Sequence, residues 1–212
     1  MRFPFSGSHT MRSSVKSPLF RGLFSAVILS LFSTLSGLIA SEPDPTPAPV
    51  PVVFSIGDFL FTRPATWDWV IPSSAMRKVQ LAVPDPDKGA GVKADVSFFY
   101  FGKDQGGTVQ ANIDRWAKQF SSPDGTPARA TTESRVIGST PVTFVSAAGS
   151  FTAGMLDGSE SAQSHFALRG AILENQTGNV FVKMTGPKSL VDAASPIFDS
   201  MIAEACQAVA AK

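Results

Sequence analysis

The segment FYFGKDQGGTVQANIDRW, residues 99–116, decides the fold because it joins an apolar strand to an amphipathic helix through a glycine-rich turn. In its helical part, Val109, Ile113 and Trp116 fall on one face, as expected for a helix that packs against a core. Thr108 stands where an N-cap residue belongs. The segment therefore predicts a helix that begins after Thr108 and covers one face of a sheet.

The glycines of this turn do not match a phosphate-binding loop. A P-loop requires G-x-x-x-x-G-K followed by Ser or Thr, and here Gly106 and Gly107 lead into Thr108 without a lysine. Asp104 would also repel a phosphate, and the G-x-G start of a dinucleotide-binding fingerprint is missing. We therefore interpret the glycines as residues that allow a positive φ in a structural turn.

Around this segment, short apolar runs alternate with Gly, Pro and Asp, which is typical of strands joined by short turns. The predicted strands are residues 57–62, 76–83, 94–101, 130–137, 141–151, 165–174 and 180–185. Asn175 and Gly178 in the segment ENQTGN predict a tight hairpin turn.

A second helix is predicted over residues 189–209. Its buried stripe is expected to contain Val191, Ala194, Phe198, Met201 and Ala205. Pro196 interrupts the pattern, so we expect a kink or a restart there, with Ser195 as a second N-cap.

The order of the predicted elements is strands, helix, strands, helix. Short connections favour antiparallel pairing, and two amphipathic helices need a sheet to cover. The predicted fold is an α+β sandwich with an antiparallel sheet of about six to seven strands covered by two main helices.

The first forty residues contain four basic residues, no acidic residue, and an apolar run over residues 22–40. This pattern predicts a secretory signal peptide cleaved after Ala40 and an exported protein, periplasmic or secreted. The alternative is an uncleaved N-terminal anchor, which would make residues 22–40 the chain's contact with a membrane. Residues 41–52 are proline-rich and predict an extended linker, and residues 53–212 are long enough for a single domain.

The charge balance and the cysteine content argue against a nucleic-acid partner and against an intramolecular disulfide. Without the four basic residues of the signal segment, the 18 Lys and Arg fall to 14, against 17 Asp and Glu. This acidic balance does not favour a nucleic-acid partner. Cys206 is the only cysteine, so no intramolecular disulfide is expected.

No catalytic motif is found in the sequence, and no catalytic residue, cofactor or metal site is predicted. His165 is the only histidine after the signal segment and has no nearby Cys or His. The G-x-S-x-G motif of serine hydrolases is absent. We therefore expect a protein that is not an enzyme.

Four residues are candidates for binding a ligand. Arg77 shares an alternating phase with Val79 and Leu81, which predicts a guanidinium on the core side of its strand. Such a guanidinium must pair with a carboxylate of the protein or with a bound anion. Arg169, in the segment ALRGAIL, is also expected to pair with one or the other. Arg115 lies on the polar face of the first helix.

The other two candidates are Trp67 and Trp69, which are predicted to lie on one side of an extended segment. Paired tryptophans can form a platform for a sugar or a peptide, or they can close the end of a core. Both interpretations are open from the sequence.

Three segments carry a resemblance to a known family: MRKVQLAVP, FYFGKDQGGTVQANIDRWAKQF and LRGAILENQTGNVFVKMTGP. Together they resemble a family of uncharacterised exported bacterial proteins with the PsbP-like fold of photosystem II extrinsic proteins. The resemblance covers most of residues 54–205. It implies an antiparallel sheet covered by helices, and binding or assembly roles rather than catalysis. No cluster of ligands matches the calcium or manganese associations of the photosynthetic members.

The sequence thus predicts a non-enzymatic protein of the cell envelope that binds a polypeptide partner or supports an assembly. The alternative is a carrier of a small anionic or sugar ligand in a pocket between sheet and helix, and an enzyme of unidentified type is a further alternative. The polar loop at residues 154–165 is either a partner-binding tip or a long hairpin connection.

Overall fold

A computed structural model of the chain describes residues 52–152 and 162–210. The signal segment, the linker up to residue 51 and residues 154–161 of the polar loop lie outside the described residues, so their predictions are not tested. Val52, the last residue assigned to the linker, begins the first strand.

Strands and helices account for most of the described residues. In chain order, the elements are β1 (Val52–Ile56), β2 (Phe59–Arg63), β3 (Asp68–Val70), β4 (Arg77–Asp85), β5 (Gly89–Tyr100), α1 (Val109–Ala117), β6 (Phe120–Ser121), β7 (Thr131–Ile137), β8 (Thr140–Phe151), β9 (Gln163–Leu173), β10 (Val180–Pro187) and α2 (Lys188–Ala210).

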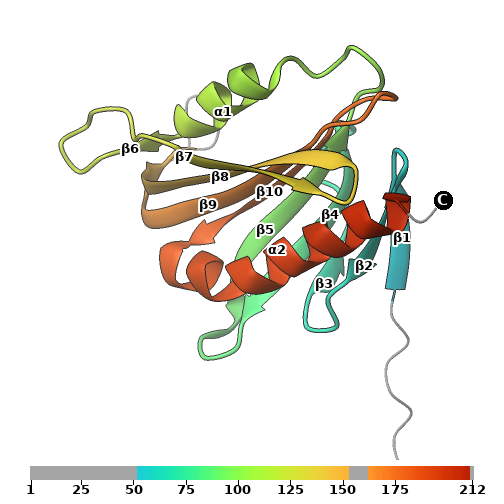
Figure 1. Ribbon diagram of the computed structural model, residues 1–212. Helices are drawn as coiled ribbons and strands as arrows, with labels where there is room; N and C mark the ends of the chain where they lie inside the picture. The colour runs from blue at the N-terminus through green and yellow to red at the C-terminus, as the bar shows by residue number, and fades with distance from the viewer. Residues whose placement is uncertain (1–51, 153–161, 211–212) are drawn as a thin grey trace, which may run out of the picture. The chain divides into compact units, whose positions relative to one another are not determined.

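One antiparallel sheet of eight strands forms the centre of the domain (Figure 1). Its order is β3-β4-β5-β10-β9-β8, and both β6 and β7 pair with β8, at opposite ends of that strand. The remaining strands, β1 and β2, form a separate hairpin. The α+β class and the antiparallel pairing are therefore as predicted, while the sheet is larger than the six to seven strands expected.

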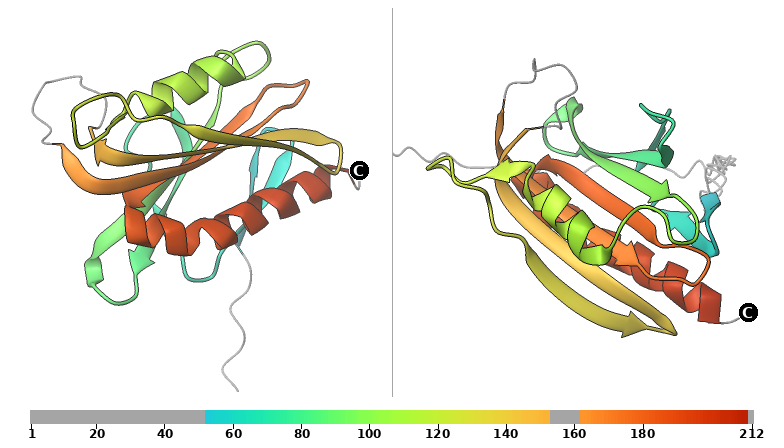
Figure 2. Two further views of the ribbon diagram at one scale, coloured as in Figure 1. Left: turned by 60° about the vertical axis from the view of Figure 1, so that its left-hand side comes forward. Right: turned by 90° about the horizontal axis from the view of Figure 1, so that it is seen from above.

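The sheet is covered on both faces, and each face has its own core. Helix α2 and the β1-β2 hairpin pack on one face, where Phe61, Phe98 and Phe198 belong to the larger core. Helix α1 packs on the other face through Ile113 and Trp116. Figure 2 shows the two helices on opposite sides of the sheet. We refer to these as the α2 face and the α1 face.

Each of the seven predicted strands overlaps an observed strand, and three strands were not predicted. Strand β1 begins at the last residue of the predicted linker and continues into residues 53–56, for which no strand was predicted, and β3 and β6 have three and two residues. Strands this short do not complete an alternating pattern, because two or three residues cannot define a period of two.

Helix α2 does not restart at Pro196, so the predicted alternative of a restart with Ser195 as a second N-cap was wrong. The helix runs unbroken from Lys188 to Ala210, and Ser195 is not an N-cap: its hydroxyl donates to the carbonyl oxygen of Val191 at 2.7 Å. The predicted apolar stripe is buried on both sides of the proline, for example at Ala194 and Phe198. Burial of that stripe offsets the one backbone hydrogen bond that proline removes.

Helix α1 lies very close to the sheet, because the ring of Trp116 packs against the backbone of Gly170 in β9. A Cβ atom at position 170 would lie 2.9 Å from Cε3 of that ring, and closer still to Cζ3. Glycine at position 170 therefore allows α1 to lie this close to the sheet.

Thr108 caps the helix as predicted, since its hydroxyl accepts a hydrogen bond from the amide of Ala111 at 3.1 Å.

The Gly170→Ala variant tests this close approach. We expect a loss of about 1–3 kcal/mol in the free energy of unfolding, measured by urea denaturation, because the methyl group overlaps the Trp116 ring. Gly91→Ala is the matched control, since a Cβ there meets no atom within 4 Å. In a chain that already carries Trp116→Leu, the same Gly170→Ala change should cost much less. Equal stability of Gly170→Ala and wild type would contradict the packing described.

Candidate functional site

A cavity of about 400 Å³ lies between α1 and the sheet, over strands β4, β5 and β10. Its walls are mainly aromatic. Phe99 and Phe181 face each other across the β5-β10 pair, and the rings of Phe99 and Phe101 stack with centroids 6.5 Å apart. Trp116 closes the cavity from the helix side. We refer to this space as the α1 pocket.

Arg77 reaches the α1 pocket through an irregularity in β4. Arg77 pairs with Phe99 of β5, but Val79 pairs with Phe98, so Lys78 is an extra residue in the ladder. This bulge places Arg77 on the α1 face, whereas Val79 and Leu81 lie in the core of the α2 face. The predicted common phase was therefore wrong for Arg77, because a bulge inverts the alternation of side chains.

The guanidinium of Arg77 is paired with Asp95 on β5. Its Nη1 donates to Oδ2 of Asp95 at 3.2 Å, and Ser97 Oγ donates to the same oxygen at 2.5 Å. Gln80 Nε2 donates to the other oxygen, Oδ1. Asp95 thus receives three hydrogen bonds, and its charge is balanced by Arg77.

Lys183 is the second cation of the pocket, and it has a neutral partner. Its Nζ donates to Oε1 of Gln119 at 2.8 Å and lies 5.8 Å from the ring centroid of Phe151. Burial and, to a lesser extent, the nearby charge of Arg77 lower the pKa of Lys183 to about 8, while Asp95 acts in the opposite direction. Among the ion pairs of the described residues, none involves Lys183.

Arg115 is the third cation and lies at the exposed side of the pocket. Its Nη1 donates to Oδ1 of Asn112 at 3.1 Å. Asn112 is buried, and its Nδ2 donates to the carbonyl oxygens of Gly106 and Thr108, at 2.9 Å each. Asn112 therefore connects the glycine-rich turn to α1 by hydrogen bonds and orients the side chain of Arg115.

Of the four predicted ligand-binding residues, the structure brings two to one pocket. Arg77 and Arg115 both line the α1 pocket. Trp67 is 1% exposed in the core of the α2 face, and Trp69 is half exposed beside the ring of Phe54. The two tryptophans are not among the residues that line the α1 pocket.

Lys183 was missed by sequence reasoning. The signal was present in the run VFVKMTG, where Val180, Val182 and Met184 mark one buried face and Phe181 the other. A lysine in a strand that is apolar on both faces is a buried charge, and such a charge needs an explanation.

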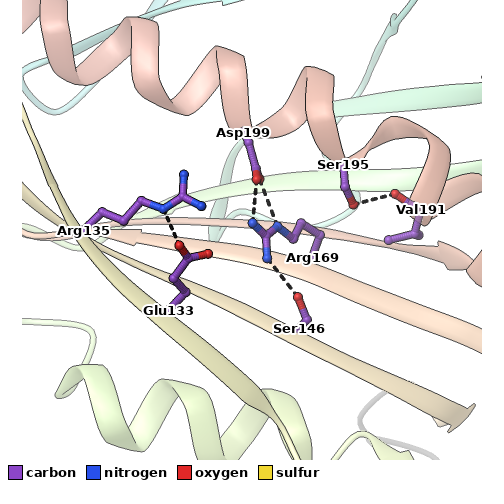
Figure 3. Close-up of polar contacts among 7 residues, drawn as sticks. All are labelled: Glu133, Arg135, Ser146, Arg169, Val191, Ser195 and Asp199. Atoms are coloured by element: carbon purple, nitrogen blue, oxygen red, sulfur yellow. Dashed lines mark hydrogen bonds and ion pairs between the residues drawn. The ribbon is translucent and has the colours of Figure 1, made fainter.

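Arg169 lies on the α2 face and is fully engaged with protein groups (Figure 3). Its Nε and Nη2 donate to the two carboxylate oxygens of Asp199 at 2.9 and 2.6 Å, and its Nη1 donates to Ser146 at 2.9 Å. The guanidinium also stacks 4.8 Å from the centroid of Phe144. This arrangement is a structural ion pair that fastens α2 to the sheet, one of the two alternatives that the sequence left open.

Three further features concern metal binding, membrane insertion and the cysteine. Across residues 52–152 and 162–210, no three His, Cys, Asp or Glu side chains converge as metal ligands would. The same residues contain no helix with the length and apolar character needed to cross a membrane. Cys206 is buried, and burial raises the pKa of its thiol to about 11.

Replacement of Lys183 by Met tests the electrostatics of the pocket. The pKa of Lys183 is about 8 in the folded chain, against 10.5 for an ordinary lysine, so folding disfavours its charged form. At pH 7, we expect Lys183→Met to raise the free energy of unfolding by about 1–3 kcal/mol. The unfolded chain binds more protons between these two pKa values, so wild type should recover stability as pH rises through that range.

Urea denaturation at pH 7 and at pH 10 measures both effects, and Lys93→Met, at an exposed position of β5, is the matched control. A stability gain that does not shrink with rising pH would contradict the lowered pKa.

A second pair of variants separates a structural ion pair from a surface one. Arg169→Met leaves the partly buried Asp199 without its partner, so we expect a loss of about 1–3 kcal/mol in the free energy of unfolding. Arg135→Met breaks the exposed pair with Glu133 and should leave the free energy of unfolding nearly unchanged, because solvent screens that pair. Thermal or urea denaturation at pH 7 distinguishes the two, and equal effects would show that the Asp199 pair does not fasten α2.

Comparison with known proteins gives similarity of fold. No protein-family model and no curated protein sequence matches the chain. The solution structure of cyanobacterial PsbP (CyanoP) from Synechocystis is similar with 13% identity and a TM-score of 0.45, over 71% of this chain and 88% of that chain.

The crystal structure of PA94, a protein of unknown function from Pseudomonas aeruginosa, is similar with 8% identity and a TM-score of 0.41. That match covers 72% of this chain and 94% of the other.

Proposed function

We propose that this protein is a non-enzymatic, exported binding protein that holds a small organic anion with an apolar body in the α1 pocket. The observation that carries the proposal is a partly buried cation, Lys183, that lines an aromatic cavity and, among the described residues, is bonded only to the neutral Gln119. Export rests on the predicted signal segment at residues 1–40.

The size and lining of the pocket suit such a ligand. Its volume of about 400 Å³ falls in the range of ligand pockets, which combine mostly apolar walls with a few placed polar groups. Phe99, Phe101 and Phe181 supply the apolar contact, and Lys183 supplies a charged donor inside the cavity. Removing water from an unpaired cation is unfavourable, and an anion beside Lys183 would offset that penalty.

The charge balance favours a single anionic group at the inner end. Arg77 is balanced by Asp95, so Lys183 contributes the only uncompensated positive charge among the described inner residues of the pocket. Arg115 is exposed and can contact a second polar group near the opening. A ligand with an aromatic or branched body and one carboxylate or sulfonate therefore matches the lining best.

A second candidate function is binding of a polypeptide partner, the role that the sequence favoured. One observation supports it: apolar side chains are exposed along and after the edge strand β3, with Trp69 at 50%, Ile71 at 88% and Met76 at 63%. Contact between Met76 and a partner would also cover one side of the α1 pocket, because Met76 lines it. Crosslinking in the envelope fraction addresses this role.

Fluorescence titration with 8-anilinonaphthalene-1-sulfonate tests the proposed pocket. The uncharged N-phenyl-1-naphthylamine has the same aromatic body without the sulfonate, so it measures the apolar contribution alone. We expect Lys183→Met to weaken binding of the sulfonate on the order of tenfold, as for loss of one charge-assisted hydrogen bond, and to leave the uncharged probe unaffected.

Lys93→Met is again the control and should bind both probes as wild type does. Equal affinity of wild type and Lys183→Met for the sulfonate would contradict the proposal, since the probe would then be bound elsewhere.

A further inference from the structure

Lys183 differs from the other lysines of the described residues in its exposure. It is only partly exposed, on a strand covered by α1. The others are all exposed to solvent: Lys78, Lys88, Lys93, Lys103, Lys118 and Lys188. An exposed ammonium group stays protonated at neutral pH, and a protonated amine is not a nucleophile.

Most groups around Lys183 do not stabilise its charged form, although the charge of Asp95 and the ring of Phe151 on β8 favour it. On β4, Arg77 places a second positive charge in the same cavity. On β5, Asp95 is already bound to Arg77, Gln80 and Ser97. Just after α1, Gln119 is neutral, and on α1 the cation Arg115 lines the opening, while the position opposite on β9 is Gly170.

These surroundings are those of a reactive lysine. An amine becomes a nucleophile when a hydrophobic pocket desolvates it or when another cation lies nearby, and Lys183 has both. The pKa of about 8 agrees with this geometry, since about a tenth of the amine is then neutral at pH 7, far more than for an ordinary lysine. A neutral amine that donates to Gln119 keeps its lone pair for a reaction partner.

We infer that Lys183 reversibly captures an aldehyde or ketone ligand as an imine, and that the ligand class is an aromatic carbonyl compound with an anionic group. The amine nitrogen attacks the carbonyl carbon, and a C–N bond forms. The carbonyl oxygen then leaves as water, with the two hydrogens of the amine, and a C=N bond remains. No oxidant or reductant is needed, and hydrolysis of the imine reverses the reaction.

The lining explains why such a ligand would be held. Phe101 and Phe181 contact an aromatic body, and Trp116 shields the C=N bond from bulk water. Arg115, at the opening, is placed to pair with the anionic group once the carbonyl has reached Lys183. This inference rests on the pocket of the proposed function, but it uses the neutral form of Lys183 and places the anionic group at Arg115, whereas simple anion binding uses the protonated form and places the anion beside Lys183.

Trapping with borohydride tests the inference. The purified protein is mixed with pyridoxal 5′-phosphate, an aromatic aldehyde with an anionic group, and the imine is reduced to a stable secondary amine. Peptide mapping by mass spectrometry then compares Lys183 with the exposed Lys93 in the same sample. We expect labelling of Lys183 at least about tenfold faster, with half of the maximal rate at a pH near 8.

Two comparisons sharpen the result. Pyridoxal, which lacks the phosphate, should label Lys183 more slowly, because it loses the pairing with Arg115. Arg115→Met should remove the difference between the two aldehydes, and Lys93→Met should not. Since the main comparison is made within the wild-type protein, it does not depend on whether Lys183→Met folds.

The outcomes separate this inference from the proposed function. If Lys183 reacts no faster than Lys93 while binding of the sulfonate probe still depends on Lys183, imine capture is wrong and anion binding stands. If neither the reaction nor the probe depends on Lys183, both proposals are wrong. Fast labelling of Lys183 with a rate that keeps rising far above pH 8 would also overturn the inference, because it would indicate an ordinary lysine.

Discussion

The ring of Trp116 rests on the backbone of Gly170, and the position of α1 depends on this contact. Gly170 lies directly opposite Lys183 in the β9-β10 pair, so the same contact brings the helix over the lysine. Gln119, one turn beyond Trp116, then reaches Lys183 with its side-chain oxygen. A larger residue at position 170 would lift the helix and separate this pair, since packed cores do not absorb an added methyl group freely.

Two cations on neighbouring strands differ in their partners: one is a structural charge, and the other is the charge that we propose binds a ligand. Arg169 on β9 has a bidentate carboxylate partner, a hydroxyl acceptor and an aromatic ring. Lys183 on β10 has one amide oxygen and a neighbouring cation. Folding gains from the first arrangement and loses from the second. A side chain that destabilises the fold and lines a cavity is a candidate for a role in binding, because binding sites commonly trade stability for function.

The sequence predicted most of the fold because its strands alternate and its helices carry clear apolar stripes. Thr108 and the stripe of Val191 and Phe198 were read correctly from local pattern alone. The site was predicted in part: Arg77 and Arg115 were selected, but their common pocket depends on contacts between segments distant in the chain. The bulge at Lys78 could not be foreseen, since one unpaired residue is specified by the partner strand and leaves the local pattern unchanged.

That bulge also explains how β4 directs apolar side chains to the α2 face and Arg77 to the α1 face. Beyond it, Val79, Leu81 and Val83 alternate into the core of the α2 face, where an arginine would be an unpaired charge. Before it, Arg77 turns to the opposite face and meets Asp95. A regular strand would have placed the guanidinium among Phe54, Phe61 and Phe98, or the valines in the pocket. The extra residue resolves this conflict, and it gives the α1 pocket an apolar wall on one side and a charged wall on the other.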